Sequence, residues 1–281
     1  MSVPARAGNV TRTRLVAVEL GDGRRRTADA LATEEPLEIR VDAPGMEQRA
    51  VAVTMRTPGS DFELAAGFLH TEGLVAATDD VAGVRYCDVP RAEQQYNVVT
   101  VALRRPYDAA LLQRNFYTTS SCGVCGKASL DSIAVRCAPV AEGPELAEAV
   151  VVALPDRLRE AQRVFDRTGG LHAAGLFDTG GTLLELREDV GRHNAVDKLV
   201  GHALLTGALP LSERVLMVSG RLSFEIVQKA AVAGIPIVCA VSAPSSLAVD
   251  AGRRFGMTLV GFLRGSRFNI YTHAERITAD P

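Results

Sequence analysis

Two cysteines separated by two residues form the part of this sequence whose chemistry is easiest to define. Cys122 and Cys125 lie in Thr118-Thr-Ser-Ser-Cys-Gly-Val-Cys-Gly-Lys127, so a glycine follows each of them. Glycine permits a tightly turned or mobile backbone. A helix predicted to begin near Lys127 would direct its N-terminus at Cys125, and both the helix dipole and the lysine ammonium favour the nucleophilic thiolate. The pair is therefore a candidate for sulfur chemistry.

Four interpretations of the cysteine pair are open. A structural zinc site usually needs two ligand pairs, whereas Cys87, Cys137 and Cys239 are isolated in the sequence. A thioredoxin-type redox pair normally opens a helix directly after a strand, and no strand is predicted to lead straight into this pair. Two incidental thiols are disfavoured by the neighbouring glycines and lysine. The fourth interpretation is sulfur relay, in which one cysteine accepts a sulfane sulfur as a persulfide and passes it to an acceptor.

A second candidate site is the start of a predicted helix in Glu188-Asp-Val-Gly-Arg-His-Asn-Ala-Val-Asp-Lys198. This segment places Arg192 and His193 in the first helical turn, where free backbone N–H groups attract anions. The alternative interpretation is a capped helix with a solvated face. On that view the i, i+4 pairs His193–Asp197 and Asn194–Lys198 face water, away from the apolar side of the helix.

Three loops extend the candidate anion site. Ser219-Gly-Arg221 and Ser242-Ala-Pro-Ser245 each lie between a predicted strand and a predicted helix. In open α/β sheets ligands bind outside the carboxyl ends of the strands, so these loops predict a nucleotide or phosphate crevice that includes Ser219 and Arg221. Arg264-Gly-Ser-Arg267 adds two guanidiniums around a turn, which suits bidentate phosphate contact. The alternatives are simple helix caps and surface arginines.

His172, in Leu171-His-Ala-Ala174, invites comparison with zinc deaminases. Those enzymes use His-x-Glu on one helix and a later Pro-Cys-x-x-Cys pair. In this sequence Ala174 stands in place of the catalytic glutamate, Ser121 stands in place of the proline, and the histidine follows the cysteines. Deaminase chemistry would therefore lack its general acid and base, and we expect His172 to be a loop or core residue.

The first half of the chain is predicted to be rich in strands. Ser60 to Glu63 has the Ser-x-x-Glu form of a capping box and precedes apolar residues at helical spacing, with Gly73 as the stop. A short helix is predicted over 108–115. Alternating polar and apolar residues predict strands over 15–20, 38–41, 50–55, 84–88 and 97–103.

From about Phe116 the predicted strands alternate with helices. This alternation indicates a parallel or mixed sheet covered by helices. A further helix is predicted after Lys127, and Pro139 closes it. The other predicted helices are 155–165, 196–204, 223–233 and 245–254. The predicted strands are 174–178, 183–187, 215–219, 235–241, 258–263 and 268–271.

Composition narrows the class of protein. The chain has 281 residues, of which 47% are hydrophobic and 23% are charged, and this excludes disorder for the bulk of it. With 31 basic and 33 acidic residues the net charge is −2, so no global field attracts nucleic acid or anionic lipid. We expect no nucleic-acid partner and no membrane partner. The odd count of five cysteines and the absence of an apolar leader predict a cytoplasmic protein.

Taken in order, the motifs resemble the formate dehydrogenase accessory sulfurtransferase family, FdhD. The resemblance covers roughly Leu15 to Thr272. It rests on Thr57-Pro-Gly-Ser-Asp-Phe-Glu-Leu-Ala-Ala-Gly-Phe-Leu69, the Cys-Gly-Val-Cys-Gly-Lys segment, Gly-Gly-Leu-His-Ala-Ala, Glu-Asp-Val-Gly-Arg-His-Asn-Ala-Val-Asp-Lys, Ser-Gly-Arg, and Gly-Phe-Leu-Arg-Gly-Ser-Arg-Phe-Asn-Ile-Tyr-Thr. Separately these motifs are weak, but in this order they are specific.

The resemblance implies a cytoplasmic, homodimeric sulfurtransferase. Such a protein accepts sulfur from a cysteine desulfurase and passes it to the molybdenum or tungsten bis-molybdopterin guanine dinucleotide cofactor, which is then inserted into formate dehydrogenase. By matching motifs, Cys122 carries the persulfide and Cys125 assists it. GDP is expected to mimic the cofactor. The residues implied to contact the cofactor are Phe262, Leu263, Arg264, Gly265, Ser266 and Arg267.

The predicted fold class is α/β, or α+β overall. A flexible tail (1–11) precedes a small strand-rich α+β domain (12–115), which the C-terminal strand (266–281) is expected to join. Residues 116–265 are predicted to form a cytidine-deaminase-like three-layer sulfurtransferase domain. Two alternative functions stay open, a non-catalytic cofactor-binding chaperone for formate dehydrogenase and a zinc-stabilised hydrolase relic of deaminase type.

Overall fold

The computed structural model describes residues 8–21, 23–87, 96–108, 139–140 and 143–279. Within these ranges the fold is of mixed α/β class, with helices packed on two larger sheets. No helix in the described ranges is long and apolar enough to cross a membrane.

A six-stranded mixed sheet forms the centre of the larger part. Its strand order is β13-β12-β11-β10-β8-β9. The three middle strands β10, β11 and β12 are parallel, while β8 and β13 run antiparallel to their neighbours β10 and β12. The strands are β8 (His172–Phe177), β9 (Leu183–Asp189), β10 (Val215–Val218), β11 (Ile237–Ala240), β12 (Thr258–Arg264) and β13 (Arg267–Thr272). The prediction of a mixed sheet is confirmed.

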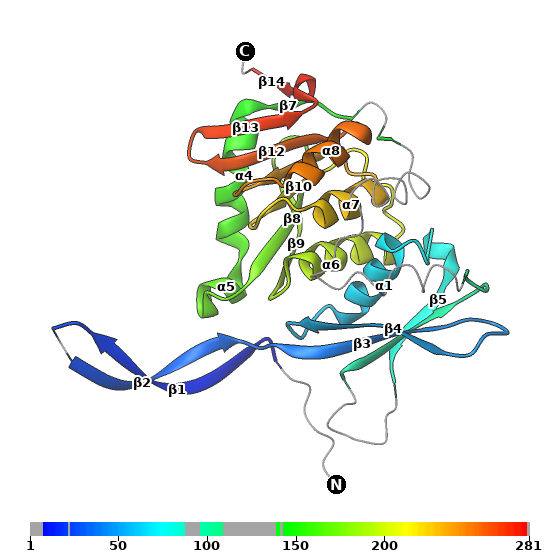
Figure 1. Ribbon diagram of the computed structural model, residues 1–281, viewed down its shortest axis with the longest axis horizontal. Helices are drawn as coiled ribbons and strands as arrows, with labels where there is room; N and C mark the ends of the chain where they lie inside the picture. Colours follow the sequence, from blue (N-terminus) through cyan, green and yellow to red (C-terminus); the bar gives the residue numbers. More distant parts are fainter. Residues whose placement is uncertain (1–7, 22, 88–95, 109–138, 141–142, 280–281) are drawn as a thin grey trace, which may run out of the picture.

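Helices cover both faces of this sheet, so the larger part has three layers (Figure 1). Alternate strand residues point to opposite faces: Val218 and Ala240 pack with one set of helices, and Met217 and Cys239 with the other. The first set is α6 (Arg192–Leu205), α7 (Phe224–Val232) and α8 (Ser246–Arg254), and α4 (Glu148–Ala161) lies on the opposite face. A short helix, α5 (Arg163–Thr168), follows α4. The likeness to cytidine deaminase in particular stays a prediction.

The smaller part is a four-stranded sheet with one helix. The strand order is β4-β3-β6-β5, and α1 (Asp61–Thr71) buries Leu64, Ala65 and Leu69 with the apolar residues of β3 and β6. The strands are β3 (Glu35–Asp42), β4 (Arg49–Arg56), β5 (Val81–Tyr86) and β6 (Val98–Leu103), and the 3-10 turn η1 (Thr78–Asp80) precedes β5.

Two glycines let α1 and α6 approach until their backbones touch. A Cβ atom added to Gly201 would lie 1.8 Å from the carbonyl oxygen of Glu63, and one added to Gly67 would lie 1.9 Å from that of Asp197. Both distances are far inside van der Waals contact. In Figure 1, α1 lies between the four-stranded sheet and α6, so this crossing joins the two parts of the molecule.

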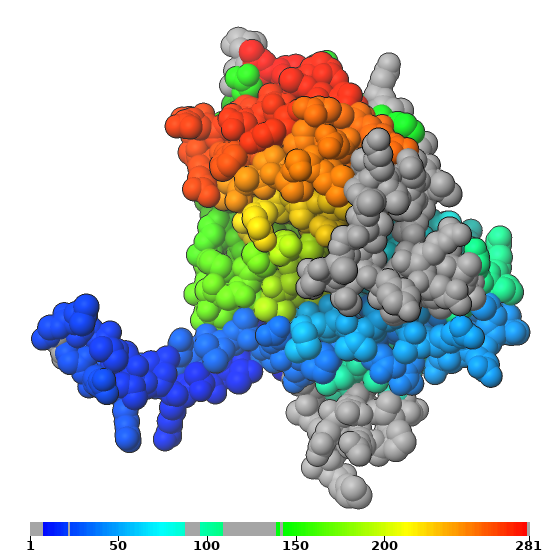
Figure 2. Space-filling view, viewed as in Figure 1, coloured from blue at the N-terminus to red at the C-terminus, as the bar shows by residue number. Residues whose placement is uncertain are grey.

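A long hairpin projects from the body of the protein (Figures 1 and 2). It consists of β1 (Val10–Glu19) and β2 (Gly23–Ala32), paired antiparallel along their whole length. Val16, Val18 and Leu20 are exposed on it. The sequence predicts the first strand but not β2, because the arginine-rich run at the start of β2 shows no clear alternation.

The C-terminal strand lies elsewhere than expected. The prediction that residues 266–281 join the N-terminal domain is wrong, since β13 pairs with β12 in the six-stranded sheet. The turn between Arg264 and Arg267 is short enough to force the chain back beside the strand it has just left. The remaining elements are the parallel pair β7 (Leu146–Ala147) and β14 (Ile277–Thr278), and the turn η3 (Ala274–Arg276). The domain boundaries themselves stay a prediction.

The cap of one helix and the start of another differ from the sequence prediction. Helix α1 begins where expected, but Ser60 has a φ of 53° and its side chain does not cap the helix; the Asp61 carboxylate instead accepts from the Gly59 N–H at 3.1 Å. Helix α4 begins at Glu148, and Pro155 lies inside it because Val151 and Leu154 bury the earlier turns. The helices predicted over 108–115 and after Lys127 lie outside the described residues.

Candidate functional site

One edge of the six-stranded sheet gathers the segments predicted to bind an anion. Because β8 and β13 run antiparallel to the middle strands, His172 at the start of β8 and Arg267 at the start of β13 lie at the same edge as the carboxyl ends of β10, β11 and β12. β9 also ends there, opposite His172, and α6 begins directly after it. The predicted crevice segments therefore share one edge, which we call the site edge.

Backbone hydrogen bonds join the neighbouring loops of the site edge. The Phe262 N–H donates to the Ser242 carbonyl at 3.2 Å. The Leu222 N–H donates to the Ala243 carbonyl at 3.1 Å, and Leu222 in turn accepts from the Ser245 N–H at 3.0 Å. These bonds form a continuous rim from the β12–β13 turn to the loop after β10.

The segment 262–267, which we call the β12–β13 turn, comprises the end of β12, the two turn residues and the start of β13, and it presents most of its predicted contact residues to solvent. Phe262 has a φ of 52° and a 44% exposed side chain, and Gly265, Ser266 and Arg267 are exposed around it. Exposed Arg264 donates from Nε to the Val241 carbonyl at 3.3 Å. Leu263 is fully buried in the core, so it offers a ligand only its backbone.

The opposite end of the site edge holds the other four predicted binding residues, Arg192, His193, Ser219 and Arg221. The Ser219 hydroxyl accepts from the Ala173 N–H at 2.9 Å, and Arg221 is exposed. His193 Nε2 lies 3.2 Å from the Ser223 hydroxyl and 3.8 Å from a Glu225 carboxylate oxygen. Burial lowers the pKa of His193 to about 4, and the positive charges of Arg192 and Lys229 add to this effect.

His172 is not among the residues that the sequence predicts to bind, yet it lies beside Arg192. A Cβ atom added to Gly220 would be 3.4 Å from His172 Nδ1 and 3.7 Å from Arg192 Cδ. Burial lowers the pKa of His172, and Arg192 lowers it further. Sequence reasoning misses His172 because its position depends on the order of strands in the sheet, and the sequence does not show that β8 lies next to β10.

The solvated-face interpretation of α6 is wrong. Asp197 and Lys198 are almost fully buried, and Asn194 is buried against β4. Lys198 Nζ lies 2.6 Å from an Asp189 carboxylate oxygen and donates to the Thr57 carbonyl at 3.0 Å. These groups lie between the two parts of the molecule, so the same motif serves both the site edge and the internal interface.

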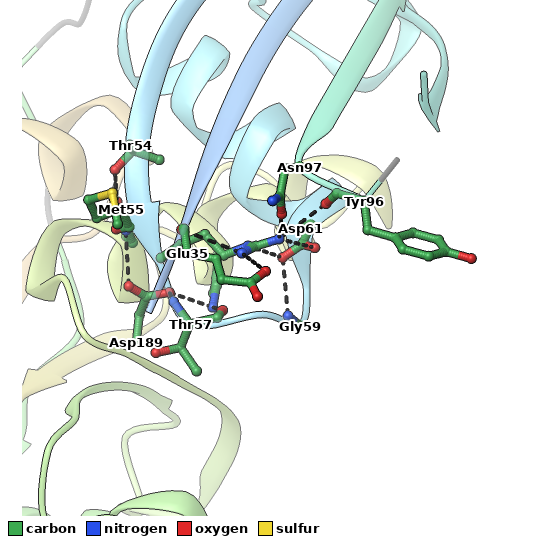
Figure 3. Close-up of polar contacts among 12 residues, drawn as sticks. Glu35, Thr54, Met55, Thr57, Gly59, Asp61, Tyr96, Asn97 and Asp189 are labelled. Atoms are coloured by element: carbon green, nitrogen blue, oxygen red, sulfur yellow. Dashed lines mark hydrogen bonds and ion pairs between the residues drawn. The ribbon is translucent and has the colours of Figure 1, made fainter. Parts of the chain in front are cut away.

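Polar contacts continue this internal interface into the N-terminal part (Figure 3). Asp189 accepts from the Thr57 N–H at 3.1 Å. The Arg56 side chain is almost fully buried, with its Nε 3.2 Å from an Asp61 carboxylate oxygen, and its Nη2 donates to Asn97 Oδ1 and to the Tyr96 carbonyl. Each charge shown there has an opposite charge or hydrogen-bond partner, which is typical of a structural network.

The candidate catalytic residues, Cys122 and Cys125, lie outside the described residues, and so does Cys137. Cys239 is a packing residue, since its side chain is fully buried in the core and burial raises the pKa of its thiol to about 12. Cys87 is half-buried, with its Sγ 2.7 Å from the Thr100 hydroxyl. In the part of the chain that the structure describes, no three His, Cys, Asp or Glu side chains are grouped to hold a metal ion.

Comparison with known proteins finds relatives that match this chain over most of its length. Residues 32–278 match the FdhD/NarQ family. The chain is 54% identical over 280 residues to the sulfur carrier protein FdhD of Streptomyces coelicolor, covering 96% of each chain, and 56% identical over 255 residues to that of Mycolicibacterium paratuberculosis, covering 89% of this chain and 92% of that one. A crystal structure from Desulfotalea psychrophila, presented as a candidate formate dehydrogenase accessory protein, superposes with a TM-score of 0.75 at 26% identity and covers 96% of this chain and all of that one.

Proposed function

The chain belongs to the FdhD/NarQ family, and on that premise we propose that it is a cytoplasmic sulfurtransferase. It takes sulfur from a cysteine desulfurase and delivers it to the molybdenum or tungsten bis-molybdopterin guanine dinucleotide cofactor that formate dehydrogenase needs. The relatives' name, sulfur carrier protein, supports a role in carrying sulfur. The description of the Desulfotalea structure as a formate dehydrogenase accessory protein supports formate dehydrogenase as the enzyme that is served. The cytoplasm suits it, because thiols stay reduced there.

The sulfur-carrying step falls to Cys122 in this proposal. Its thiolate attacks the terminal sulfur of the desulfurase persulfide, the S–S bond of the donor breaks, and the donor cysteine leaves as a thiolate. Cys122 then holds the persulfide, and Cys125 assists its transfer. Cys239 is a poor candidate for this role, because its burial and raised pKa keep it an inaccessible thiol.

The cofactor, as the substrate that receives the sulfur, binds along the site edge. Phe262 offers an exposed aromatic face on which a guanine base can stack, and Arg264 and Arg267 are exposed guanidiniums of the kind that bind phosphates. Arg192, His193, Ser219 and Arg221 continue the polar rim toward β8. The observation that carries this proposal is that one sheet edge collects all of these segments, which are separated in the sequence.

A homodimer is also part of the proposed function. The β1–β2 hairpin is a two-stranded sheet that projects from the body, and such a hairpin is marginally stable in water by itself. Its exposed Val16, Val18 and Leu20 would be covered by a second copy of the chain. Removing residues 10–32 is expected to convert the dimer to a monomer in sedimentation measurements.

Mass spectrometry tests the sulfur-carrying step. After incubation with a cysteine desulfurase and cysteine, we expect one added sulfur atom on Cys122 and none in the Cys122→Ala variant. Cys87→Ala is the matched control, since this half-buried cysteine contacts Thr100 and is expected to leave loading unchanged. An unmodified Cys122, or equal loading of the Cys122→Ala variant, would contradict the proposal.

Maturation of formate dehydrogenase tests whether the relay is required. A strain whose only copy is the Cys122→Ser, Cys125→Ser double variant is expected to accumulate inactive formate dehydrogenase. Normal activity in that strain would reject sulfur transfer and favour a chaperone that only binds and delivers the cofactor.

A further inference from the structure

A cavity of about 310 Å³, which we call the α6 cavity, lies at the end of the six-stranded sheet away from the site edge. Leu176 lines it near the end of β8, Leu184 near the start of β9, and Arg214 just before β10. The last turns of α6 and the loop from α6 to β10 supply the other walls. The α6 cavity therefore shares no residue with the candidate binding site.

The floor of the α6 cavity is apolar. Its side chains are buried in the core beneath α6, and they are Leu176, Leu199, Ala203 and Leu211. Leu184 adds a side chain that is 41% exposed. Pockets for small molecules typically measure about 300–1,000 Å³ and combine a mostly apolar lining with a few polar groups. The α6 cavity has the size and the lining that suit a small organic molecule.

Acidic groups outnumber basic groups in and around the α6 cavity. The guanidiniums there are those of Arg187 and Arg214, whereas the carboxylates are those of Glu63, Asp178, Glu185 and Glu213. The excess charge is therefore negative whether His202 is neutral or protonated. The last turn of α6 adds the negative end of the helix dipole. Positive charge on a ligand should favour its binding here.

Most of the charged groups on the α6 side are already paired. Arg187 donates to a Glu63 carboxylate oxygen at 2.6 Å and to a Glu185 carboxylate oxygen at 2.8 Å. The His202 ring lies between the same two carboxylates, with its Nδ1 3.1 Å from Glu63 and its Nε2 3.3 Å from Glu185. These four side chains hold one another, so they form a wall of the cavity and leave little capacity for a ligand.

Glu213 differs from them. It lines the α6 cavity and is exposed, and its carboxylate has no hydrogen-bond or ion-pair partner among the described residues. The neighbouring Arg214 donates to the Glu213 carbonyl at 3.4 Å rather than to the carboxylate. Backbone hydrogen bonding with Thr182 lowers the pKa of Asp178, and the charge of Arg214 adds to this effect, so Arg214 has its own acidic neighbour. The Glu213 carboxylate is available to a cation.

We propose that the α6 cavity binds a small organic cation. Its apolar group lies on Leu176, Leu199 and Leu211, and its ammonium group donates to the Glu213 carboxylate. An aromatic or aliphatic primary amine has this chemistry. A cavity walled by two strands, a helix and a loop suits a molecule that enters whole. The same chemistry occurs where an apolar side chain lies beside a lysine in a partner protein, and the experiment distinguishes this source.

Nuclear magnetic resonance titration of the full-length protein tests the site. The probes are 2-phenylethylamine, 2-phenylethanol and 3-phenylpropanoate, which carry the same ring with a positive, a neutral and a negative end. We expect the amine to shift the backbone signals of Leu184, His202 and Ser212. It should bind about fivefold more tightly than the alcohol, the upper range for an ion pair that water reaches, and the carboxylate should bind most weakly.

Glu213→Gln should weaken binding of the amine about fivefold and leave binding of the alcohol unchanged, because it removes the charge and keeps the shape. The matched control is Glu160→Gln. Glu160 is exposed on α4, which covers the opposite face of the sheet, so its loss should leave all three probes unaffected. Ala208→Trp is a second variant. Ala208 is an exposed residue of the cavity wall, so the larger side chain should block all three probes and keep the melting temperature.

Three results would overturn the site: no shift with the amine at millimolar concentration, equal affinities for amine and alcohol, or equal weakening by Glu213→Gln and Glu160→Gln. A Phe-Lys dipeptide capped at both ends distinguishes the sources. Binding of this dipeptide about tenfold tighter than that of the amine would assign the cavity to a partner protein and reject the free amine, whereas weaker binding supports the amine. The proposal uses no residue of the site edge, so it stands even if Cys122 never carries sulfur.

Discussion

The internal interface between α1 and α6 and the site edge use charged residues in opposite ways, although one segment of sequence supplies both. Between Glu188 and Lys198, the side chains of Asp189, Asp197 and Lys198 are almost fully buried and paired. The buried Nε atom of Arg192, in the same segment, has no hydrogen-bond partner among the described residues. Residue type alone does not separate structural charges from binding charges, but pairing in the folded chain does.

The lysines make the same point. Only three of the 31 basic residues are lysines. The two that the structure describes, Lys198 and Lys229, are buried and each lies within 3 Å of an aspartate oxygen. The exposed cations of the site edge are arginines, which suit bidentate anion contact better than lysine does. Breaking a buried pair should therefore cost stability, and removing an exposed arginine should cost binding.

The largest loss in the free energy of unfolding is expected from Lys229→Met. This change leaves the Asp197 carboxylate buried, and among the described residues the Thr71 hydroxyl, which donates to it at 2.8 Å, remains as its partner. Breaking a buried pair in this way costs about 3–5 kcal/mol, which urea denaturation measures directly. The exposed i, i+3 pair of Arg253 and Asp250 supplies the control, since Arg253→Met should cost less than about 0.5 kcal/mol.

A double variant distinguishes charge from packing in that result. Lys229→Met with Asp197→Leu removes both charges, and replacing a buried pair by apolar residues is often neutral. We expect it to recover most of the lost stability. A cost below about 1 kcal/mol for the single change would mean that the pair does not hold the interface.

The next largest effect is expected from Gly201→Ala. Its new methyl group would lie 1.8 Å from the Glu63 carbonyl oxygen, so α1 and α6 would have to separate. Overpacking of this kind costs about 3 kcal/mol, and a lower melting temperature by calorimetry would report it. Gly83→Ala is the control, because no atom lies within 4 Å of the Cβ position there. Similar melting temperatures for the two variants would contradict a close helix crossing.

Much of the fold is readable from the sequence because periodicity reports which face of an element is buried. The α6 pattern of Val196, Leu199, Val200, Ala203 and Leu204 predicts its apolar face, and these five residues are buried. The same pattern does not predict the second buried face of α6. Asp197 and Lys198 are charged residues that the pattern assigns to solvent, but packing of the N-terminal part against α6 buries them. Pairing across 141 residues, as between Lys198 and Thr57, leaves no local signal.

The sequence predicts many residues of the candidate site but not how they are arranged in space. Strand–loop–helix junctions predict that Ser219 and Arg221 lie at a carboxyl strand end, and the structure has them there. The position of His172 at the site edge depends on the antiparallel pairing of β8 with β10, and the sequence of a short strand does not show which strands lie beside it. The cysteine pair, by contrast, is identified by sequence motif alone.

A third effect, on binding rather than stability, is expected at the β12–β13 turn. Arg264→Ala or Arg267→Ala should leave the free energy of unfolding within about 0.5 kcal/mol, because both side chains are exposed. Each should weaken GDP binding about tenfold through loss of a charged hydrogen bond, as measured by calorimetry. Absence of binding heat with the wild-type protein and any guanine nucleotide would remove the turn as a guanine site.

The smallest effect is expected from the pH dependence of stability contributed by His193. Its pKa in the folded protein is about 4, below the ordinary value of about 6.5. Between those values the unfolded chain binds a proton that the folded chain does not, so the folded state loses stability as pH falls from about 6.5 to about 4 and no more below that. The loss should be modest, because the side chain is about one-third exposed. Urea denaturation of His193→Gln should lack this part of the slope, whereas identical slopes would mean that His193 is not held neutral at the site edge.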